Sequence, residues 1–405
     1  MYTISLPASL HRLLTRLKEA GFLAYAVGGC VRDALLGRPT NDWDVTTSAT
    51  PQQIKTVFSD CRTIDTGIKH GTVTVMLDGD SYEVTVFRVD GAYTDGRHPD
   101  SVVFSSSLRE DLARRDFTVN AMAYSPDEGI IDPFGGREDL QSRLLRAVGN
   151  PSARFTEDAL RILRGVRFAS VLGFSIEEET SRAMRDLCQR LSLVSDERIL
   201  VELTKTVLGK NAHEMLSAYH DVVSSAWHSL SDMSAYLTGV SLFSHLPPVL
   251  EVRMAALFSK VKEATTPALF LSLKCSREVA FAVSSLVLEM AKPLPRTSYE
   301  EKCLLGKYGI DFCQKLALLW KAKCQLSGET PCEISQILTD WQNMVQNKVC
   351  LSVSDLAVKG EDLLALGVEK GKPIGDWLKT LLDRVLLDRL PNEKNALLVY
   401  VESHL

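Results

Sequence analysis

The spacing of the apolar residues changes once along this chain, near residue 156, and that change restricts the fold more than any other feature. Before it, short runs that alternate apolar and polar residues are separated by glycine-containing turns, as in half-buried strands. After it, apolar residues recur every three or four positions, as in helices. The sequence therefore predicts an α+β amino-terminal region followed by an all-α remainder.

The amino-terminal region is predicted to hold a mixed sheet with flanking helices. Residues 8–20 form the first expected helix, which Gly21 closes, and a short helix follows Gly28-Gly29 and stops at Gly37. The turn Asp78-Gly79 joins the last two expected strands. The expected strands are 22–27, 43–46, 63–64, 72–76 and 82–88.

Composition excludes several classes of protein. The formal net charge of −5 excludes a protein that coats nucleic acid through an overall positive charge, so RNA contacts must come from local patches. Arginines do cluster, at positions 109, 114, 115, 137, 143, 146, 154, 161, 164 and 167. The nine cysteines lack Cys-x-x-Cys spacing, which argues against a zinc site or a disulfide framework.

The termini and the apolar runs indicate the compartment. The chain has no basic segment followed by a signal-like apolar segment, and no apolar run reaches the ~18 residues that a membrane span needs. We therefore expect a cytoplasmic protein with no membrane association.

Asp42 and Asp44 are the first candidates for chemistry. Alternate side chains of a strand share a face, so the two carboxylates are expected to project together while Trp43 points away. Paired carboxylates that act with substrate phosphates suit magnesium and phosphoryl transfer. An isolated Asp-x-Asp is also typical of a solvated turn, so the neighbouring motifs decide.

Two neighbouring features favour the catalytic interpretation. Gly28-Gly29 opens a helix that carries Arg32, and such a turn offers backbone amides to phosphates, although a tight turn alone remains an alternative. Glu83 lies in an otherwise apolar strand, where it either completes the metal site or acts on the attacking hydroxyl. A solubility charge on an edge strand is the alternative for Glu83.

Two later segments carry candidate nucleotide contacts. Arg115 supplies charge for phosphates, and Asp116 and Asn120 are spaced to bond a ribose. Thr156 is expected to cap a helix on which Asp158 and Arg161 lie side by side. Such an acceptor–donor pair matches the edges of cytosine and adenine and not those of guanine and uracil.

In order and spacing, these motifs resemble those of the class II tRNA nucleotidyltransferases. The resemblance covers residues 20–200, and Leu356–Leu363 resembles the family's tail motif. The motifs are Gly28-Gly29-x-Val31-Arg32-Asp33, Asp42-x-Asp44, Lys69-His70-Gly71-Thr72, Arg114-Arg115-Asp116-Phe117-Thr118-x-Asn120-Ala121, Asp132-Pro133-Phe134-Gly135-Gly136 and Glu157-Asp158-x-x-Arg161.

The resemblance implies an elongated, seahorse-like protein that adds C, C and A to the tRNA 3′ end from CTP and ATP. It implies a catalytic head over residues 1–148, a base-recognising neck over 149–206, a helical body over 207–310 and a tRNA-binding helical tail over 311–405. Asp132–Gly136 would act as a hinge between head and neck. The implied partners are the 3′ end, acceptor stem and elbow of tRNA, and no obligatory protein partner is evident.

The resemblance also implies roles for single residues. Asp42 and Asp44 would bind Mg²⁺ in a two-metal mechanism, with Glu83 as a further catalytic candidate. Asp158 and Arg161, with Glu157, would select CTP and then ATP without a nucleic-acid template. The candidate nucleotide-binding residues are Gly28, Gly29, Arg32, Arg115, Asp116, Asn120, Glu157, Asp158, Arg161, Arg164 and Arg167.

Other functions stay open at this point. The same motifs resemble bacterial poly(A) polymerases, although only a short segment precedes Gly28. Enzymes that add only CC tend to lack a flexible loop, and the polar, glycine-bearing stretch Asp90–Ser107 favours full CCA synthesis or A addition. His220-Asp221 is a weak signal for a metal phosphohydrolase. A non-catalytic RNA-binding module would not need Asp42 and Asp44.

Overall fold

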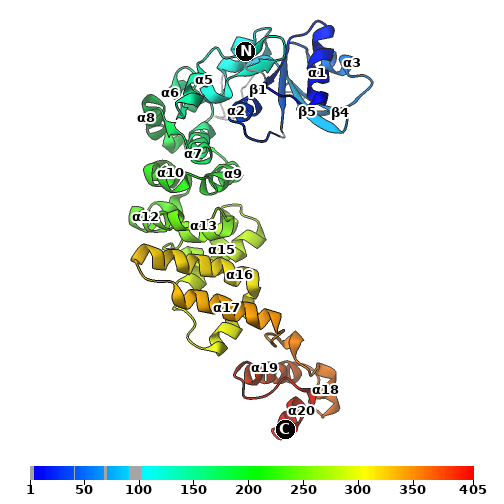
Figure 1. Cartoon of the computed structure of the whole chain (residues 1–405), viewed down its shortest axis with the longest axis vertical. Helices are drawn as coiled ribbons and strands as arrows, with labels where there is room; N and C mark the ends of the chain where they lie inside the picture. Colours follow the sequence, from blue (N-terminus) through cyan, green and yellow to red (C-terminus); the bar gives the residue numbers. More distant parts are fainter. Residues whose placement is uncertain (1–3, 41, 68–70, 91–101) are drawn as a thin grey trace. The chain divides into compact units, whose positions relative to one another are not determined.

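The computed structural model describes residues 4–40, 42–67, 71–90 and 102–405 and divides the chain into two compact units, Met1–Met233 and Ser234–Leu405 (Figure 1). The first unit holds the large sheet, whose last strand ends at Ile131, and the second unit is helical in its described secondary structure. The predicted change from α+β to all-α is therefore confirmed.

A mixed seven-stranded sheet forms the described amino-terminal part of the first unit. Its strand order is β3-β4-β5-β2-β1-β8-β9, in which only β2 and β5 run parallel to each other. The strands are β1 (Ala24–Val27), β2 (Asp44–Thr47), β3 (Arg62–Gly67), β4 (Thr72–Leu77), β5 (Asp80–Val86), β8 (Ala123–Ser125) and β9 (Gly129–Ile131). The five predicted strands are present, and β8 and β9 were not predicted.

Turn residues and caps define the predicted elements. Asp78 and Gly79 both have positive φ, which suits the tight turn that joins β4 to β5. Gly21, with φ of 85°, follows the end of α1 (Ala8–Glu19), and its N–H donates to the carbonyl of Lys18. Helices α1 and α3 (Pro51–Val57) pack together on the sheet (Figure 1). The predicted turn and helix end are confirmed.

The short elements of the first unit connect its sheet to its helices. β6 (Arg88–Asp90) pairs with β7 (Val102–Phe104), and the two-residue strands β10 (Leu144–Leu145) and β11 (Ser175–Ile176) run parallel. The small helices of this region are α2 (Gly29–Leu35), α4 (Leu108–Ala113), the 3₁₀ helix η2 (Thr118–Asn120) and α5 (Gly136–Gln141).

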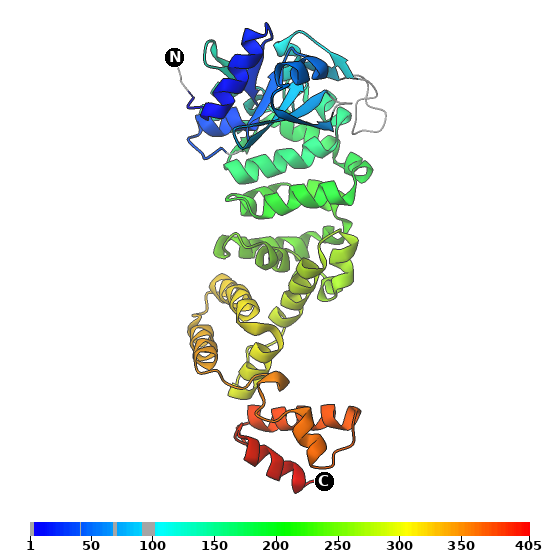
Figure 2. The same ribbon diagram turned by 90° about the vertical axis from the view of Figure 1, so that its right-hand side faces the viewer.

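A stack of helices completes the first unit, as the segments coloured turquoise to green in Figure 2 show. Helix α7 packs on α9 and α10, because its buried face carries Ile162, Val166 and Ala169 at helical spacing. The stack comprises α6 (Pro151–Glu157), α7 (Leu160–Leu172), α8 (Glu178–Asp186), η3 (Cys188–Leu193), α9 (Asp196–Val207), α10 (Ala212–Ala218), α11 (His220–Ala226) and η4 (His228–Leu230).

The second unit consists of helices with their own apolar cores. Gly309 has a non-helical φ of 78° and breaks the long helix α16 in two. Leu356, Val358 and Leu363, which belong to the predicted tail motif, lie in the core beneath α18–α20. The helices are α12 (Met233–Ser241), η5 (Leu242–His245), α13 (Leu250–Leu257), η6 (Lys262–Thr265), α14 (Pro267–Ser272), α15 (Arg277–Met290), α16 (Ser298–Ser327), α17 (Cys332–Gln346), η7 (Val353–Asp355), α18 (Gly360–Ala365), α19 (Lys372–Leu386) and α20 (Lys394–Glu402).

Two further observations concern the cysteines and the apolar helices. All nine cysteines are free thiols. Within the described ranges, none of the helices combines the length and the hydropathy that crossing a membrane requires. The boundaries of the four predicted domains and the hinge at Asp132–Gly136 stay predictions.

Two glycines of the second unit allow a matched test of its packing. A Cβ on Gly239 in α12 would lie 2.4 Å from the carbonyl oxygen of Ala256 in α13, whereas a Cβ on Gly375 in α19 would meet no atom within 4 Å. We expect Gly239→Ala to lower the free energy of unfolding by about 2 kcal/mol through overpacking. Gly375→Ala should raise it by about 0.5–1 kcal/mol, since alanine favours helices. Urea unfolding of both variants checks this, and equal effects would contradict the close approach of α12 and α13.

Candidate active site

Asp42 and Asp44 share an exposed face at the start of β2. Both residues are exposed, whereas Trp43 between them is buried, so the predicted alternation is confirmed. Asp44 begins the strand and Asp42 directly precedes it. The two carboxylates therefore stand at the start of a central strand of the sheet, exposed where a substrate can reach them.

Glu83 lies beside this acid pair. It is exposed on β5, and the parallel pairing of β2 and β5 places it opposite Asp44. Although Asp44 reaches solvent, the protein around its carboxyl raises the pKa to about 6. The negative charges of Asp42 and Glu83 act in the same direction, and the charge of Arg115 opposes them. The site thus concentrates negative charge that a cation would offset.

The Gly28-Gly29 turn brings backbone and cations together. Gly28 has φ of 86°, which favours glycine, and its N–H donates to the carbonyl of Met122. A Cβ on Gly28 would lie 2.8 Å from Nη1 of Arg115, so the absence of a side chain admits this guanidinium. Arg115 is further held by Asp111, to which its Nη2 donates at 3.4 Å.

A chain of side-chain hydrogen bonds links the other predicted nucleotide contacts. Nη1 of Arg32 donates to Oδ1 of Asn120 at 2.5 Å, and Nδ2 of Asn120 donates to Oδ1 of Asp116 at 3.1 Å. Nε and Nη2 of Arg164 both donate to Oδ2 of Asp116, at 2.8 and 2.6 Å. The predicted proximity of Asp116 and Asn120 is confirmed, although a 3₁₀ turn and not an α-helix brings them together.

Asp116 is the buried centre of this chain, with 7% of its surface exposed. Burial alone raises the pKa of a carboxyl, but the charge of Arg164 and the hydrogen bonds from Asn120 and Arg164 hold the pKa of Asp116 well below its usual range. Asp116 is therefore a fixed negative charge at neutral pH.

Phe168 on α7 collects three guanidinium groups. The guanidinium carbons of Arg32, Arg164 and Arg167 lie 5.1, 5.2 and 4.0 Å from the centre of its ring. Nε of Arg167 also lies 3.0 Å from Oε2 of the buried Glu202 on α9. These contacts fix the arginines of α7 relative to α2.

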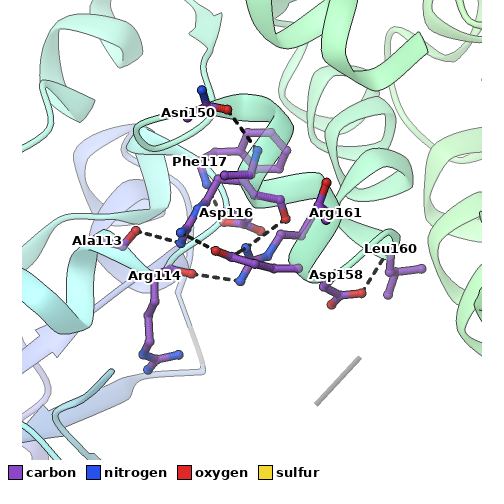
Figure 3. Close-up of polar contacts among 12 residues, drawn as sticks. Ala113, Arg114, Asp116, Phe117, Asn150, Asp158, Leu160 and Arg161 are labelled. Atoms are coloured by element: carbon purple, nitrogen blue, oxygen red, sulfur yellow. Dashed lines mark hydrogen bonds and ion pairs between the residues drawn. The ribbon is translucent and has the colours of Figure 1, made fainter. Parts of the chain in front are cut away.

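The predicted helix start at Thr156 was wrong. Thr156 lies inside α6, which Asn150 caps, and Asp158 has extended backbone between α6 and α7 (Figure 3). Oδ1 of Asp158 accepts from the N–H of Leu160, the first residue of α7, at 3.0 Å, whereas Ala159 occupies the N-cap position of that helix. Asp158 and Arg161 therefore do not lie side by side on one helix.

Arg161 is held from several sides. Its Nη1 donates to Oε2 of Glu157 at 2.6 Å and to the carbonyl of Arg154, and its Nη2 donates to the carbonyl of Arg114 at 2.9 Å (Figure 3). Oδ2 of Asp158 accepts from Nη2 of Arg198 at 3.0 Å. The structure thus brings Glu157 and Arg161 into direct contact and orients Asp158 separately.

Sequence reasoning missed three residues that orient the site. Asp111 is fully buried and holds Arg114 and Arg115, and its i, i+3 and i, i+4 spacing to them is a signal that was present. Glu202 and Arg198 lie on α9, about 40 positions after their partners on α7 and Asp158, so no local pattern could find them.

Some predicted features fall outside the described residues or have other partners. Lys69-His70 and residues 91–101 of the predicted loop Asp90–Ser107 lie outside the described residues. His220 is buried with Nε2 3.1 Å from the carbonyl oxygen of Leu230, and Asp221 pairs with Arg185 at 2.6 Å. Both side chains of this dyad therefore contact other parts of the fold. In the described ranges, no three His, Cys, Asp or Glu side chains group as a complete metal site.

Three known families match successive parts of the chain. The family described as the poly A polymerase head domain matches residues 24–146, which contain the acid pair. The probable RNA and SrmB-binding site of polymerase A matches residues 173–221. The putative tRNA nucleotidyltransferase domain 2 matches residues 251–401.

Individual proteins match over nearly the whole chain. The CCA-adding enzyme of Lacticaseibacillus paracasei is 38% identical over 95% of this chain and 94% of its own length. The CCA-adding enzyme of Lactococcus lactis subsp. cremoris is 38% identical over 97% of this chain and 95% of its own length. The crystal structure of the Bacillus stearothermophilus CCA-adding enzyme in complex with CTP superposes with a TM-score of 0.82, 30% identity and coverage of 98% of this chain and 96% of that one.

Removing the charge of Asp116 tests the chain of hydrogen bonds that runs from Arg32 to Arg164. Asp116→Asn leaves Arg164 without its main partner, so we expect the free energy of unfolding to fall by about 3 kcal/mol at pH 7. The folded protein lowers the pKa of Asp116. The ionised Asp116 therefore stabilises the fold fully above the pKa of an unfolded aspartate, about 4, and this stabilisation is lost as the pH falls from there toward the folded pKa. Urea unfolding at pH 7 and at lower pH should therefore show the difference between wild type and variant shrinking. Asp127→Asn, which breaks only an exposed pair with Lys18, is the control and should change little.

Proposed function

Because the chain belongs to the family of CCA-adding enzymes, we propose that it adds C, C and A to the 3′ end of tRNA from CTP and ATP, without a nucleic-acid template. The observation that carries this proposal is the exposed acid pair Asp42 and Asp44 on the sheet of the first unit, in the same unit as the chain of hydrogen bonds from Arg32 to Arg164.

The acid pair fits a divalent cation. Asp42 and Asp44 offer exposed hard oxygen ligands on one face, and Glu83 adds a third negative charge beside them. Two carboxylates do not complete the coordination of Mg²⁺, so the remaining ligands would come from substrate phosphates and water. When bound, Mg²⁺ supplies charge stabilisation at the phosphate oxygens and lowers the pKa of the attacking hydroxyl. Asp42 and Asp44 are the residues that would hold it.

The protein's own cations and amides position the nucleotide. Arg32 and Arg115 flank the Gly28 turn, where they bind the triphosphate. Asp116 and Asn120 orient the ribose, and their mutual hydrogen bond fixes both side chains before a substrate arrives. The 3′ oxygen of tRNA forms a bond to the α-phosphorus as the bond to the β-phosphate oxygen breaks, and pyrophosphate leaves.

Base selection rests on the groups that Asp158 and Arg161 keep free. Nη1 of Arg161 donates both of its hydrogens, to Glu157 and to the carbonyl of Arg154. Nη2 donates one hydrogen, to the carbonyl of Arg114. Nε–H and one Nη2–H have no partner among the described residues and can donate to a base. Each oxygen of Asp158 accepts one hydrogen bond and keeps further acceptor capacity. Glu157 and Arg198 thus hold the selecting pair in place.

Removing one carboxylate tests the catalytic role. We expect Asp42→Ala to lower nucleotide transfer by at least about three orders of magnitude, since bound metal supplies several kcal/mol of stabilisation. The fold should persist because Asp42 is exposed. The assay uses Mg²⁺, single labelled nucleotides and tRNA that lacks CCA or ends at C74 or C75.

The control for this assay is Asp186→Ala, an exposed carboxylate on α8 without a side-chain partner among the described residues, which should transfer at the wild-type rate. Transfer by Asp42→Ala at that rate would contradict the role of the acid pair. Long adenosine tails made by the wild type would indicate a poly(A) polymerase, and failure to add C would restrict the protein to A addition.

A conservative change at Asp158 tests base selection. Asp158→Asn keeps an oxygen that can accept from the N–H of Leu160 but replaces the other acceptor with a donor, so we expect the preference for CTP and ATP over GTP and UTP to fall by about 10- to 100-fold. Ratios of kcat/KM for the four nucleotides measure this. Asp196→Asn, at the exposed start of α9, is the matched control, and unchanged ratios in Asp158→Asn would refute the selecting role.

A further inference from the structure

A basic cleft lies between the segment after α2 and the helices α7 and α9 of the first unit. It encloses about 460 Å³, and its described lining carries Arg32, Arg38, Arg167, Lys205 and Lys210 against a single carboxylate, Asp33. Apolar side chains such as Phe168 and Val171 form the rest of its wall. The positive charge gathers here although the whole chain carries −5.

The charges of the cleft are only partly used within the protein. Arg32 binds both oxygens of Asp33, and Arg167 binds Glu202. In the part of the chain that the structure describes, the side chains of Arg38, Lys205 and Lys210 make no ion pair or hydrogen bond. Lys205 and Lys210 are exposed and Arg38 is half-buried. Three cations are thus available to an external anion.

The cleft adjoins the proposed nucleotide site without coinciding with it. Arg32 contributes to both, because its Nη1 reaches Asn120 while the side chain also lines the cleft. Asp116, Asp158, Arg161 and Arg164 are absent from the lining. An anionic chain that leaves the active site past Arg32 would therefore enter this cleft.

We infer that the cleft binds the phosphodiester backbone of the tRNA strand whose 3′ end enters the active site. This inference rests on the proposed function, because a 3′ end that attacks the nucleotide must be followed by further phosphates close to Arg32. Flexible lysines suit phosphates as point charges, and the apolar wall can pack against ribose. The one carboxylate in the lining is bound by Arg32, so base edges meet few groups that read them.

The charge-removing double variant Lys205→Ala/Lys210→Ala tests this inference. Neither lysine has a side-chain partner to lose among the described residues, and alanine favours the helix at position 205. Binding of fluorescent tRNA that lacks CCA is measured at several KCl concentrations, together with the KM for CTP. We expect Kd for tRNA to rise about tenfold. The negative slope of log K against log[KCl] should become shallower by about one to two, because fewer phosphates are neutralised. The KM for CTP should stay unchanged.

Two further variants serve as controls. Lys205→Arg/Lys210→Arg keeps both charges and should bind tRNA like the wild type. Arg62→Ala removes an exposed cation of β3 that lies outside the cleft, and it should leave both Kd and slope unchanged.

Two results would overturn the inference. The first is an unchanged Kd and salt slope in the alanine double variant. The second is a raised KM for CTP with an unchanged Kd for tRNA, which would assign the cleft to the free triphosphate. Failure of the wild type to extend tRNA would contradict the proposed function instead, because the binding measurement does not depend on extension.

Discussion

The contact between Asp116 and Arg164 is the interaction on which the rest of the site depends. Asp116 follows α4 beside the sheet, whereas Arg164 lies on α7, so their ion pair joins the α+β part of the first unit to its helical stack. A buried charge without a partner costs several kcal/mol, which restricts where α7 can lie. The same carboxylate accepts from Asn120, and Asn120 accepts from Arg32. One buried charge thus sets the positions of α2, the 3₁₀ turn and α7 together.

Features that depend on local periodicity could be predicted from the sequence. The alternation of Asp42, Trp43 and Asp44 follows from the two-residue repeat of a strand, and burial of the apolar tryptophan decides which face the acids take. The positive φ of Asp78 and Gly79 follows from the preference of Asp-Gly pairs for tight hairpin turns. The contact of Asp116 with Asn120 was also within reach, because any helical turn brings positions four apart close together.

Features that depend on long-range contacts could not be predicted. Thr156, Glu157 and Asp158 resemble a helix start, but Asn150 and Pro151 begin a helix earlier and Asp158 ends it, so the apparent start is the junction of two helices. The carboxylate of Asp158 accepts from the N–H of Leu160 at the start of the next helix and from Arg198, 40 residues away. Only the packing of α9 against α7 brings that arginine near, and no pattern within a window of a few turns contains this information.

The distribution of charge shows why a count of arginines misleads about RNA contacts. The cluster of ten arginines up to Arg167 suggested a local basic patch, yet most of its members are paired with buried or half-buried acids. The pairs are Arg114 and Arg115 with Asp111, Arg146 with Asp139, Arg154 and Arg161 with Glu157, Arg164 with Asp116, and Arg167 with Glu202. Among the described residues of the cleft, the cations left for an external anion are Arg38, Lys205 and Lys210, and Arg38 lies far from the two lysines in the sequence. The ion pairs of the clustered arginines hold the side chains of the nucleotide site in fixed positions. Electrostatic attraction for a longer anionic strand is therefore left to scattered residues, which only the folded chain brings to one cleft.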